Sequence, residues 1–328
     1  TTLGACLVRH GHSVGYLTGD PLRKRRDRAL GESLSAAEAG AVTGTVHHHP
    51  TSGWMTVVGG RDEALEAWLG RYRPDVLHVA NPAHVGTAAM SCARRLGIPV
   101  VVTTMDFWWL CPKATLLRED LSVCDGTPAW RECLGCISRS HPRPGTRALG
   151  GLPSALMPAA LAVYYARNLT RGLTFEDMRR WPGRRVHLLR TLARVEHVIF
   201  PSQATRDALQ RAVAPDRWSL IPYGLPSMWF REPRPPRRGP IDPAELTVGY
   251  AGALLPHKGV HILLEAIERL GWTQTRVRIA GGSPDADYAR RLRGQGTRLN
   301  VEFAGALSVE KMPEFLAGLD VLVLPSLW

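Results

Sequence analysis

The chain has 328 residues, of which 45% are hydrophobic and 21% are charged, a composition typical of a globular protein long enough for two domains. Its longest apolar stretch, residues 149–166, contains Pro153 and Pro158 and is shorter than the roughly 20 apolar residues of a membrane-spanning helix. That stretch is therefore excluded as a transmembrane segment. The sequence starts without Met and stops soon after a strand-like run, so we expect truncation at both ends.

The net charge of +12 is distributed unevenly along the chain. Residues 1–242 carry the whole excess, because acidic and basic residues balance in residues 243–328. A basic first half suits an anionic lipid surface or a phosphorylated acceptor, although most of the basic residues are Arg, which a GC-rich genome also explains. We expect a cytoplasmic protein with a peripheral contact to the inner face of an anionic membrane and no nucleic-acid partner.

Short β-rich runs alternate with amphipathic segments, which is the pattern of parallel sheets flanked by helices. In the first half the pattern predicts strands at residues 13–18, 76–80, 100–104, 197–201 and 219–222. It predicts helices at residues 63–72, 86–96 and 204–212. The histidine run at residues 47–49 is interpreted as a solvated loop, with metal binding as the alternative.

A segment rich in Pro and Arg, residues 226–243, predicts a linker between a domain at residues 1–225 and a second domain at residues 244–328. The second domain continues the alternation, with strands expected at residues 246–251, 276–280, 300–303 and 320–324. Open parallel sheets bind ligands at the carboxyl ends of their strands. We therefore predict an α/β protein in which two Rossmann-like domains face a ligand-binding cleft.

The second domain opens with a loop that is suited to phosphate. In residues 246–271, LTVGYAGALLPHKGVHILLEAIERLG, a strand leads through glycines to Lys258 and Gly259, and apolar residues then recur at helical spacing. Free N–H groups at a helix start favour an anion, and an ammonium group adds a full charge. The loop is neither a Walker motif nor a dinucleotide fingerprint. An ordinary strand–helix turn with an exposed lysine is the alternative.

Three segments resemble, in order and spacing, the donor-binding domain of family-four retaining glycosyltransferases with the GT-B fold: YAGALLPHKGVHILLEAI, VRIAGGSPD and VEFAGALSVEKMPEFLAGLDVLVLPSLW. RVEHVIFPSQATRDAL and WSLIPYGL resemble the end of that family's acceptor domain. The resemblance implies transfer of a sugar, with retention of configuration, from a nucleotide diphosphate sugar to a glycan, lipid-linked or small-molecule acceptor. The alternatives are a non-catalytic sugar-nucleotide or glycan-binding relative and a nucleotide-sugar epimerase on the same fold.

The resemblance also assigns roles to particular residues. Lys258 is expected to hold the donor diphosphate and to stabilise its charge as the sugar departs. Ala253 stands where the family often has Arg, so one usual diphosphate contact is missing. The other donor-binding positions lie where the backbone would approach the nucleotide, although the glycines among them are equally explained by tight turns. These positions are Gly252, Gly259, Gly281, Gly282, Gly305, Pro325 and Ser326. The family's glutamate pair is expected beyond residue 328.

The stretch TTMDFWWLCPK follows the strand expected at residues 100–104, where many relatives end in a His-Asp pair. Met105 stands in the histidine position and cannot transfer a proton, so a histidine-dependent role is absent. Asp106 is predicted to orient the acceptor hydroxyl, with capping of the next turn as the alternative. Phe107, Trp108 and Trp109 are predicted either to stack on the acceptor or to belong to the core.

The segment at residues 106–136 reads as a cysteine-rich insertion and resembles a subset of these transferases with Asp-Phe-Trp and Cys-Pro motifs. Cys111, Cys124, Cys133 and Cys136 lie within this segment, and the last two form a C-x-x-C unit. Four thiolates predict a tetrahedral structural metal site, most simply zinc, with an iron–sulfur cluster as a second possibility. Disulfides and unlinked thiols are the remaining alternatives.

Overall fold

The computed structural model describes residues 2–19, 46–49, 62–82, 86–139, 147–148, 150–153, 155–156, 159–160, 163, 181–225 and 242–327. The chain divides into two compact units, Thr1–Gly224 and Leu225–Trp328. The basic cluster at residues 23–28 and almost all of the Pro- and Arg-rich segment lie outside the described residues, as does much of the apolar stretch at residues 149–166. Among the helices that the structure describes, none is long and apolar enough to cross a bilayer.

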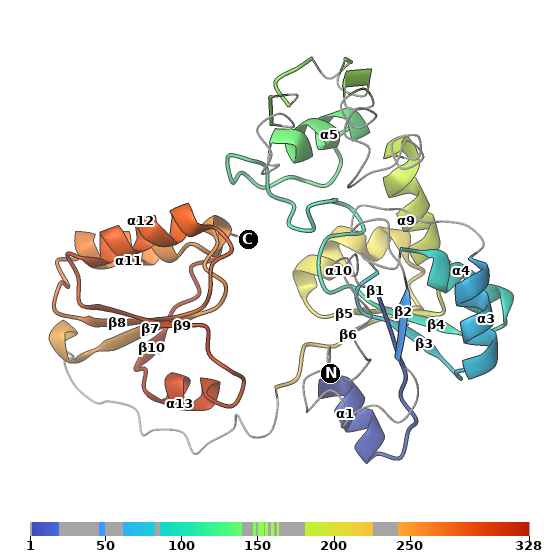
Figure 1. Cartoon of the computed structure of the whole chain (residues 1–328), viewed down its shortest axis with the longest axis horizontal. Helices are drawn as coiled ribbons and strands as arrows, with labels where there is room; N and C mark the ends of the chain where they lie inside the picture. Colours follow the sequence, from blue (N-terminus) through green and yellow to red (C-terminus); the bar gives the residue numbers. More distant parts are fainter. Residues whose placement is uncertain are drawn as a thin grey trace. The chain divides into compact units, whose positions relative to one another are not determined.

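The first unit contains a four-stranded parallel sheet in the order β3-β4-β5-β6 (Figure 1). Its strands are β3 Leu77–Val79, β4 Val100–Thr103, β5 His197–Phe200 and β6 Trp218–Leu220. The helices around it include α3 Glu63–Tyr72, α4 Ala88–Arg95, α9 Arg184–Leu192 and α10 Gln203–Leu209, which η3 Gln210–Ala212 continues. Along β4 the side chains of Val100 and Val102 are fully buried, so the alternation of this strand directs one face into the core. These strands overlap the expected ranges closely.

A separate two-stranded sheet corrects one sequence interpretation. Strand β1 Tyr16–Gly19 pairs in parallel with β2 Val46–His49, so the histidine run belongs to a strand rather than to a loop. β-pairing depends on the backbone and therefore does not require the apolar alternation on which the prediction relied. The side chains of the three histidines lie outside the described residues. Helix α1 Thr2–Arg9 precedes this sheet.

The cysteine-containing segment of the first unit ends in a helix that the sequence did not reveal. This helix, α5 Trp130–Arg139, packs against the short helix η2 Trp181–Gly183, which leads directly into α9. An isolated antiparallel bridge between Leu117 and Val123 folds the preceding loop back on itself. The start of α9 therefore lies against the cysteine segment.

The second unit contains the parallel sheet that its alternating pattern predicts, and the strand order is β10-β7-β8-β9. Its strands are β7 Thr247–Ala251, β8 Arg276–Ala280, β9 Val301–Gly305 and β10 Val321–Leu322. Its helices are η5 Pro243–Glu245, η6 Pro256–Lys258, α11 Val260–Arg269, α12 Ala286–Gly296 and α13 Met312–Ala317. Figure 1 shows α11 and α12 together on one face of this sheet and α13 on the other. Val260, Val277 and Ile279 are fully buried between the sheet and α11, which fixes the start of that helix above the strands.

Candidate functional site

The loops at the carboxyl edge of the second sheet are tied to one another through their backbones. The Gly252 N–H donates to the Ala280 carbonyl at 2.9 Å, and the Gly281 N–H donates to the Gly305 carbonyl at 2.8 Å. Gly281 has a φ of 155°, and a Cβ atom there would lie 1.8 Å from the Gly252 oxygen. Because any larger residue would push the β7 and β8 loops apart, glycine is needed for their close approach.

A second layer of contacts fixes the β7 loop itself. The Leu254 N–H donates to the Gly282 carbonyl at 2.9 Å, and the Ser283 hydroxyl donates to the Leu254 carbonyl at 2.7 Å. The Tyr250 hydroxyl donates to the Ala253 carbonyl at 2.8 Å. The Ala253 side chain is exposed, so the position at which relatives often have Arg faces solvent in this chain.

Lys258 and Gly259 stand at the start of α11, directly beside the last strand's loop. Gly259 caps the helix with a φ of 71°, and a Cβ atom there would lie 2.0 Å from the Pro325 carbonyl oxygen. The Leu327 N–H donates to the His257 carbonyl at 2.9 Å. The structure thus brings to one edge of the sheet all the positions assigned to the donor. They are Gly252, Ala253, Lys258, Gly259, Gly281, Gly282, Gly305, Pro325 and Ser326.

The packing at Gly259 leads to a prediction with a matched control inside the same unit. Gly271 has nearly the same φ, 68°, but a Cβ atom there meets nothing within 4 Å. Gly271→Ala should therefore lower the free energy of unfolding by about 1 kcal/mol, which is the backbone cost alone. Gly259→Ala adds the collision with Pro325, and we expect a loss of about 3 kcal/mol together with weaker nucleotide binding. Urea unfolding of both variants checks this, and equal losses would contradict the close approach.

At the carboxyl end of β4 in the first unit, Asp106 occupies a turn. Its Oδ1 accepts a hydrogen bond from the Trp108 N–H at 2.8 Å, which is the capping role given as the alternative. Burial raises the pKa of Asp106, and the bond from Trp108 opposes part of that rise. Tyr223 lies close enough for the charge of Asp106 to add to the effect of burial in raising the tyrosine pKa. An acceptor-orienting role for Asp106 stays a prediction.

The aromatic residues after Asp106 belong to the core. Trp108 and Trp109 are each 1% exposed, and Phe107 is 8% exposed. The two indoles pack edge to face, with centroids 5.6 Å apart. The acceptor-stacking alternative is therefore wrong for the two tryptophans, because no ring face is open to a ligand.

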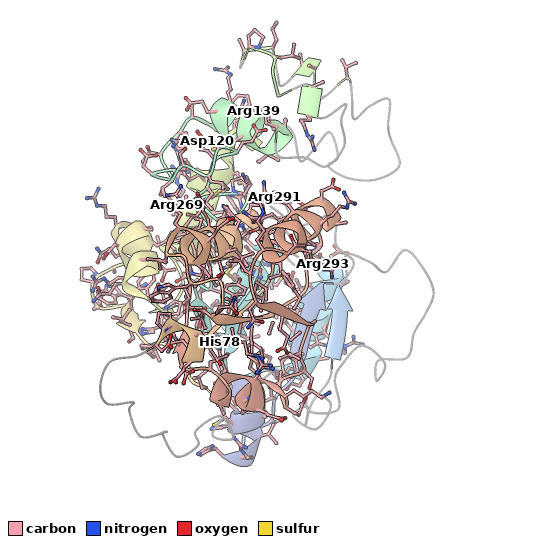
Figure 2. The ribbon with its side chains drawn as sticks, turned by 90° about the vertical axis from the view of Figure 1, so that its left-hand side faces the viewer. His78, Asp120, Arg139, Arg269, Arg291 and Arg293 are labelled. Carbon is pink, nitrogen blue, oxygen red and sulfur yellow. The ribbon has the colours of Figure 1, made fainter. Side chains whose placement is uncertain are left out.

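Two polar residues near this edge were missed from the sequence. His78 on β3, labelled in Figure 2, has its Nε2 2.8 Å from the hydroxyl oxygen of Thr103 on β4. Tyr223 follows β6 and is 58% exposed. The only local signal was a histidine inside an apolar strand and a tyrosine after a strand end. Neither identifies a neighbour, because both partners are distant in sequence.

The four predicted metal ligands are free thiols that are each partly buried. Burial, together with the charges of the neighbouring Cys111 and Cys124, raises the pKa of the Cys133 thiol to about 11. Burial also raises the pKa of Cys136. Cys133 thus lies close enough to the other cysteines for their charges to influence its pKa. However, no group of three or more His, Cys, Asp or Glu side chains in the described part of the chain has an arrangement that could hold a metal ion.

Arg184, which the sequence analysis did not single out, lies beside these thiols. Its side chain is 3% exposed, its Nη2 donates to the Trp108 carbonyl at 2.8 Å, and its guanidinium lies 4.8 Å from the centre of the Trp108 ring. Nε and Nη1 are buried and have no hydrogen-bond partner among the described residues. Burial lowers the pKa of Arg184 to about 10, whereas negative charge on Cys111 or Cys133 would raise it. A buried guanidinium with two nitrogen atoms that donate no hydrogen bond would be stabilised by an anion nearby.

Comparison with known proteins gives matches in both units. Residues 1–120 match the family model described as Glycosyltransferase Family 4, and residues 245–328 match Glycosyl transferases group 1. A search of curated proteins found no match.

Solved structures of similar fold include sucrose-phosphate synthase from Thermosynechococcus elongatus and a glycosyltransferase from Rickettsia africae. The sucrose-phosphate synthase is 16% identical with a TM-score of 0.50, and the match covers 100% of this chain and 69% of the synthase chain. The Rickettsia africae glycosyltransferase is 12% identical with a TM-score of 0.50, and the match covers 99% of this chain and 67% of that protein's chain. HepE of Anabaena, solved with UDP, is 16% identical with a TM-score of 0.47, covering 88% of this chain and 62% of HepE. The chain thus spans less than two thirds of HepE.

The two family matches together cover more than half of the chain, and each falls in a different unit. Each unit contains a parallel sheet with flanking helices, and the structural matches extend over nearly all residues. These findings identify the chain as a group 1, family 4 glycosyltransferase sequence with the GT-B fold.

Proposed function

We propose that the protein transfers a sugar, with retention of configuration, from a nucleotide diphosphate sugar to an acceptor. The observation that carries this proposal is the set of glycine loops tied together at the edge of the second sheet, with Lys258 at the start of α11 among them. Backbone N–H groups at a helix start and a neighbouring ammonium group are the donors that a diphosphate requires. The match of residues 245–328 to group 1 transferases supports the same assignment.

In the proposed reaction, the bond between the anomeric carbon and the diphosphate oxygen breaks as the acceptor oxygen attacks from the same face. The departing diphosphate takes the acceptor proton, and Lys258 stabilises the negative charge that develops. Asp106 is proposed to orient the acceptor hydroxyl with its carboxylate, since only Oδ1 is used in the turn to Trp108. Met105 contributes no proton transfer. The acceptor is a glycan, a lipid-linked compound or a small molecule, and the positive charge of residues 1–242 supports an anionic partner.

A panel of nucleotides tests the donor assignment. Isothermal titration of the chain with UDP, ADP, GDP and dTDP should show binding of at least one diphosphate, and the matching monophosphate should bind more weakly because it lacks the second anionic group. Binding of nucleosides and diphosphates with equal affinity would contradict a phosphate site at Lys258. A non-catalytic relative would bind the sugar nucleotide and leave it intact, whereas an epimerase would change the sugar without any acceptor.

We also propose that Cys111, Cys124, Cys133 and Cys136 bind one metal centre, most simply zinc. Local backbone structure positions three of these cysteines, although the described residues do not bring the thiols into a metal-binding arrangement. The Cys124 N–H donates to the Leu116 carbonyl at 2.7 Å, and Cys133 and Cys136 lie one turn apart on α5. The chelating C-x-x-C unit thus lies on one helical face.

The loop between the first two cysteines adopts a conformation that needs support. Ala114, Leu116 and Leu121 have φ values of 61°, 51° and 65°, which is the left-handed region that residues with a Cβ atom avoid. Each residue in this conformation lowers the folding stability by about 1 to 2 kcal/mol. A metal centre bound by Cys111 and Cys124 would offset this cost, because structural sites contribute folding free energy directly.

The charge around the cysteines supports an anionic centre. Four thiolates on a divalent ion leave a net charge of about −2. The guanidinium of Arg184, whose Nε and Nη1 have no hydrogen-bond partner among the described residues, supplies one compensating positive charge. The Lys113 Nζ, 3.9 Å from the Cys136 sulfur, supplies a second. If the thiols are neutral, no described residue forms an ion pair with the buried Arg184, whereas a metal-bound thiolate cluster would provide a counter-charge.

A further inference from the structure

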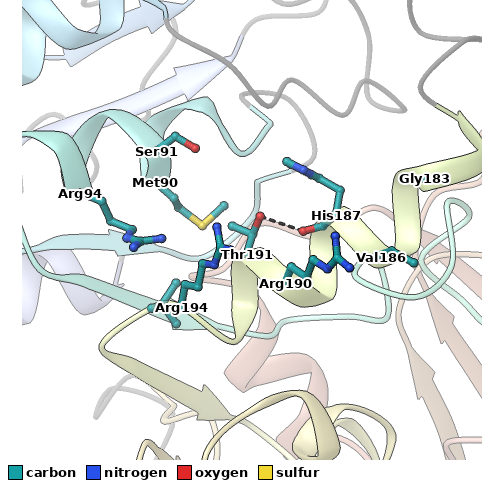
Figure 3. Close-up of a pocket in the computed structure, with 10 residues that line it drawn as sticks. Met90, Ser91, Arg94, Gly183, Val186, His187, Arg190, Thr191 and Arg194 are labelled. Carbon is teal, nitrogen blue, oxygen red and sulfur yellow. Dashed lines mark hydrogen bonds between the residues drawn. The ribbon is translucent and has the colours of Figure 1, made fainter.

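A pocket on the first unit lies between α4 and α9 and has a volume of about 370 Å³ (Figure 3). Its apolar lining includes Val186, which is 50% exposed, together with Met90 and Val195, which are 1% and 2% exposed. The guanidinium groups of Arg94, Arg190 and Arg194 project around it, and Figure 3 shows that Arg94 and Arg194 extend towards each other across the gap between the two helices. The pocket therefore combines a hydrophobic surface with three cationic groups.

The lining is positively charged without compensation. Its residues include three arginines and one histidine but no Asp or Glu. Within the described ranges, none of the three arginines forms an ion pair. Three guanidinium groups around one cavity repel one another unless an anion lies between them. This arrangement differs from an ordinary solvated helix face, where arginines alternate with acids.

The wall of the pocket is also held in place from within. The His187 Nε2 lies 2.8 Å from the hydroxyl oxygen of Thr87, which is fully buried at the start of α4. The Thr191 hydroxyl donates to the His187 carbonyl at 2.9 Å, a bond drawn in Figure 3. The α4 and α9 helices are thereby linked at one end of the pocket, which keeps the arginines of the two helices opposite each other.

We propose that this pocket binds a phosphate ester, with the phosphate between the guanidinium groups and the organic part against the exposed side chain of Val186. Arginine forks match phosphate oxygens in a bidentate manner, and the apolar lining accepts a short hydrocarbon or glycerol portion. The phosphate comes either from an anionic lipid headgroup or from a soluble phosphorylated compound. The proposal concerns the first unit alone and does not depend on the donor site around Lys258.

The test compares two pairs of arginines on the same unit. Arg190→Gln with Arg194→Gln removes two charges from the pocket, whereas Arg211→Gln with Arg217→Gln removes two exposed charges elsewhere. Glycerol 3-phosphate is titrated in one arm, and vesicles of phosphatidylglycerol or phosphatidylcholine are sedimented in the other, both at low salt. Whichever probe the parent protein binds, we expect the Arg190→Gln, Arg194→Gln variant to bind it about 10-fold or more weakly. The Arg211→Gln, Arg217→Gln variant should bind it with nearly the parent affinity.

The two arms separate the sources of the phosphate. Binding to glycerol 3-phosphate indicates a soluble ester, and binding to phosphatidylglycerol vesicles alone indicates a headgroup. Ser91→Asp, which adds a negative charge to the lining, should cause the same loss without removing an arginine. Absence of binding to both probes, or equal losses in the pocket and control pairs, would overturn the proposal. Thermal unfolding of each variant shows whether a loss reflects misfolding, and Ser91→Asp then decides.

Discussion

Lys258→Ala is expected to weaken nucleoside diphosphate binding by about 10- to 150-fold, since a charge-assisted contact to phosphate contributes roughly 1.5 to 3 kcal/mol. The side chain lies in η6, immediately before Gly259 and the first turn of α11. We therefore propose that its ammonium shares one anion site with the N–H groups at the start of the helix. The monophosphate, which forms fewer contacts, should lose less affinity than the diphosphate.

Lys311→Ala provides the matched control for this prediction. Lys311 is the other lysine of the second unit, is exposed, and stands at the start of α13 rather than α11. The two variants change the net charge equally, so a difference between them reports position and not total charge. Calorimetric affinities that are the same for the parent and Lys258→Ala would remove this residue from the donor site.

Purified protein is expected to contain close to one metal per chain, and Cys133→Ser is expected to reduce this below about 0.2. Cys6→Ser, which changes a cysteine on α1 outside the cluster, should leave the metal content unchanged. Elemental analysis after purification without added metal, with a visible spectrum of an anaerobic preparation, separates zinc from iron–sulfur. A metal-free parent whose four clustered thiols all react readily would return them to the role of small packing residues.

The same proposal predicts a graded effect at Arg184. Arg184→Leu removes the buried positive charge and should weaken metal affinity by about 10- to 100-fold, the range for groups that support metal ligands indirectly. Arg184→Lys keeps the charge and should retain most of the metal. A purely structural role would lower stability in Arg184→Leu without a change in metal affinity, so the two measurements together distinguish the roles. Chelation should increase hydrogen exchange in residues 106–139 and leave the second unit protected.

The strands were predictable because their apolar runs decide both burial and conformation. In β7 and β8, residues such as Val248, Val277 and Ile279 are buried on a sheet whose neighbours are all parallel. Besides α5, two elements escaped prediction for local reasons. β2 consists largely of histidines, and α9 has four charged or histidine side chains among nine residues, so neither shows a clear apolar period.

The glycine loops of the second sheet were predictable because glycine marks backbone conformations that other residues avoid. Gly259 and Gly281 stand where a Cβ atom would collide with a neighbouring loop. Arg184 could not be found in this way, because its partner carbonyl, that of Trp108, lies 76 residues away and only the fold joins them. Asp106 was correctly given a turn-capping alternative, since an Asp two residues before a free N–H is a local arrangement.

The most direct test of the central claim is to follow the sugar. The chain is incubated with labelled nucleotide sugars and an acceptor extract, and the new glycosidic linkage is assigned by mass spectrometry and NMR. We predict a product with the donor's anomeric configuration, made more slowly by Asp106→Asn, which keeps the Oδ1 acceptor of the turn but lacks the charge. An inverted linkage, or a sugar that is epimerised without any transfer, would contradict a retaining glycosyltransferase.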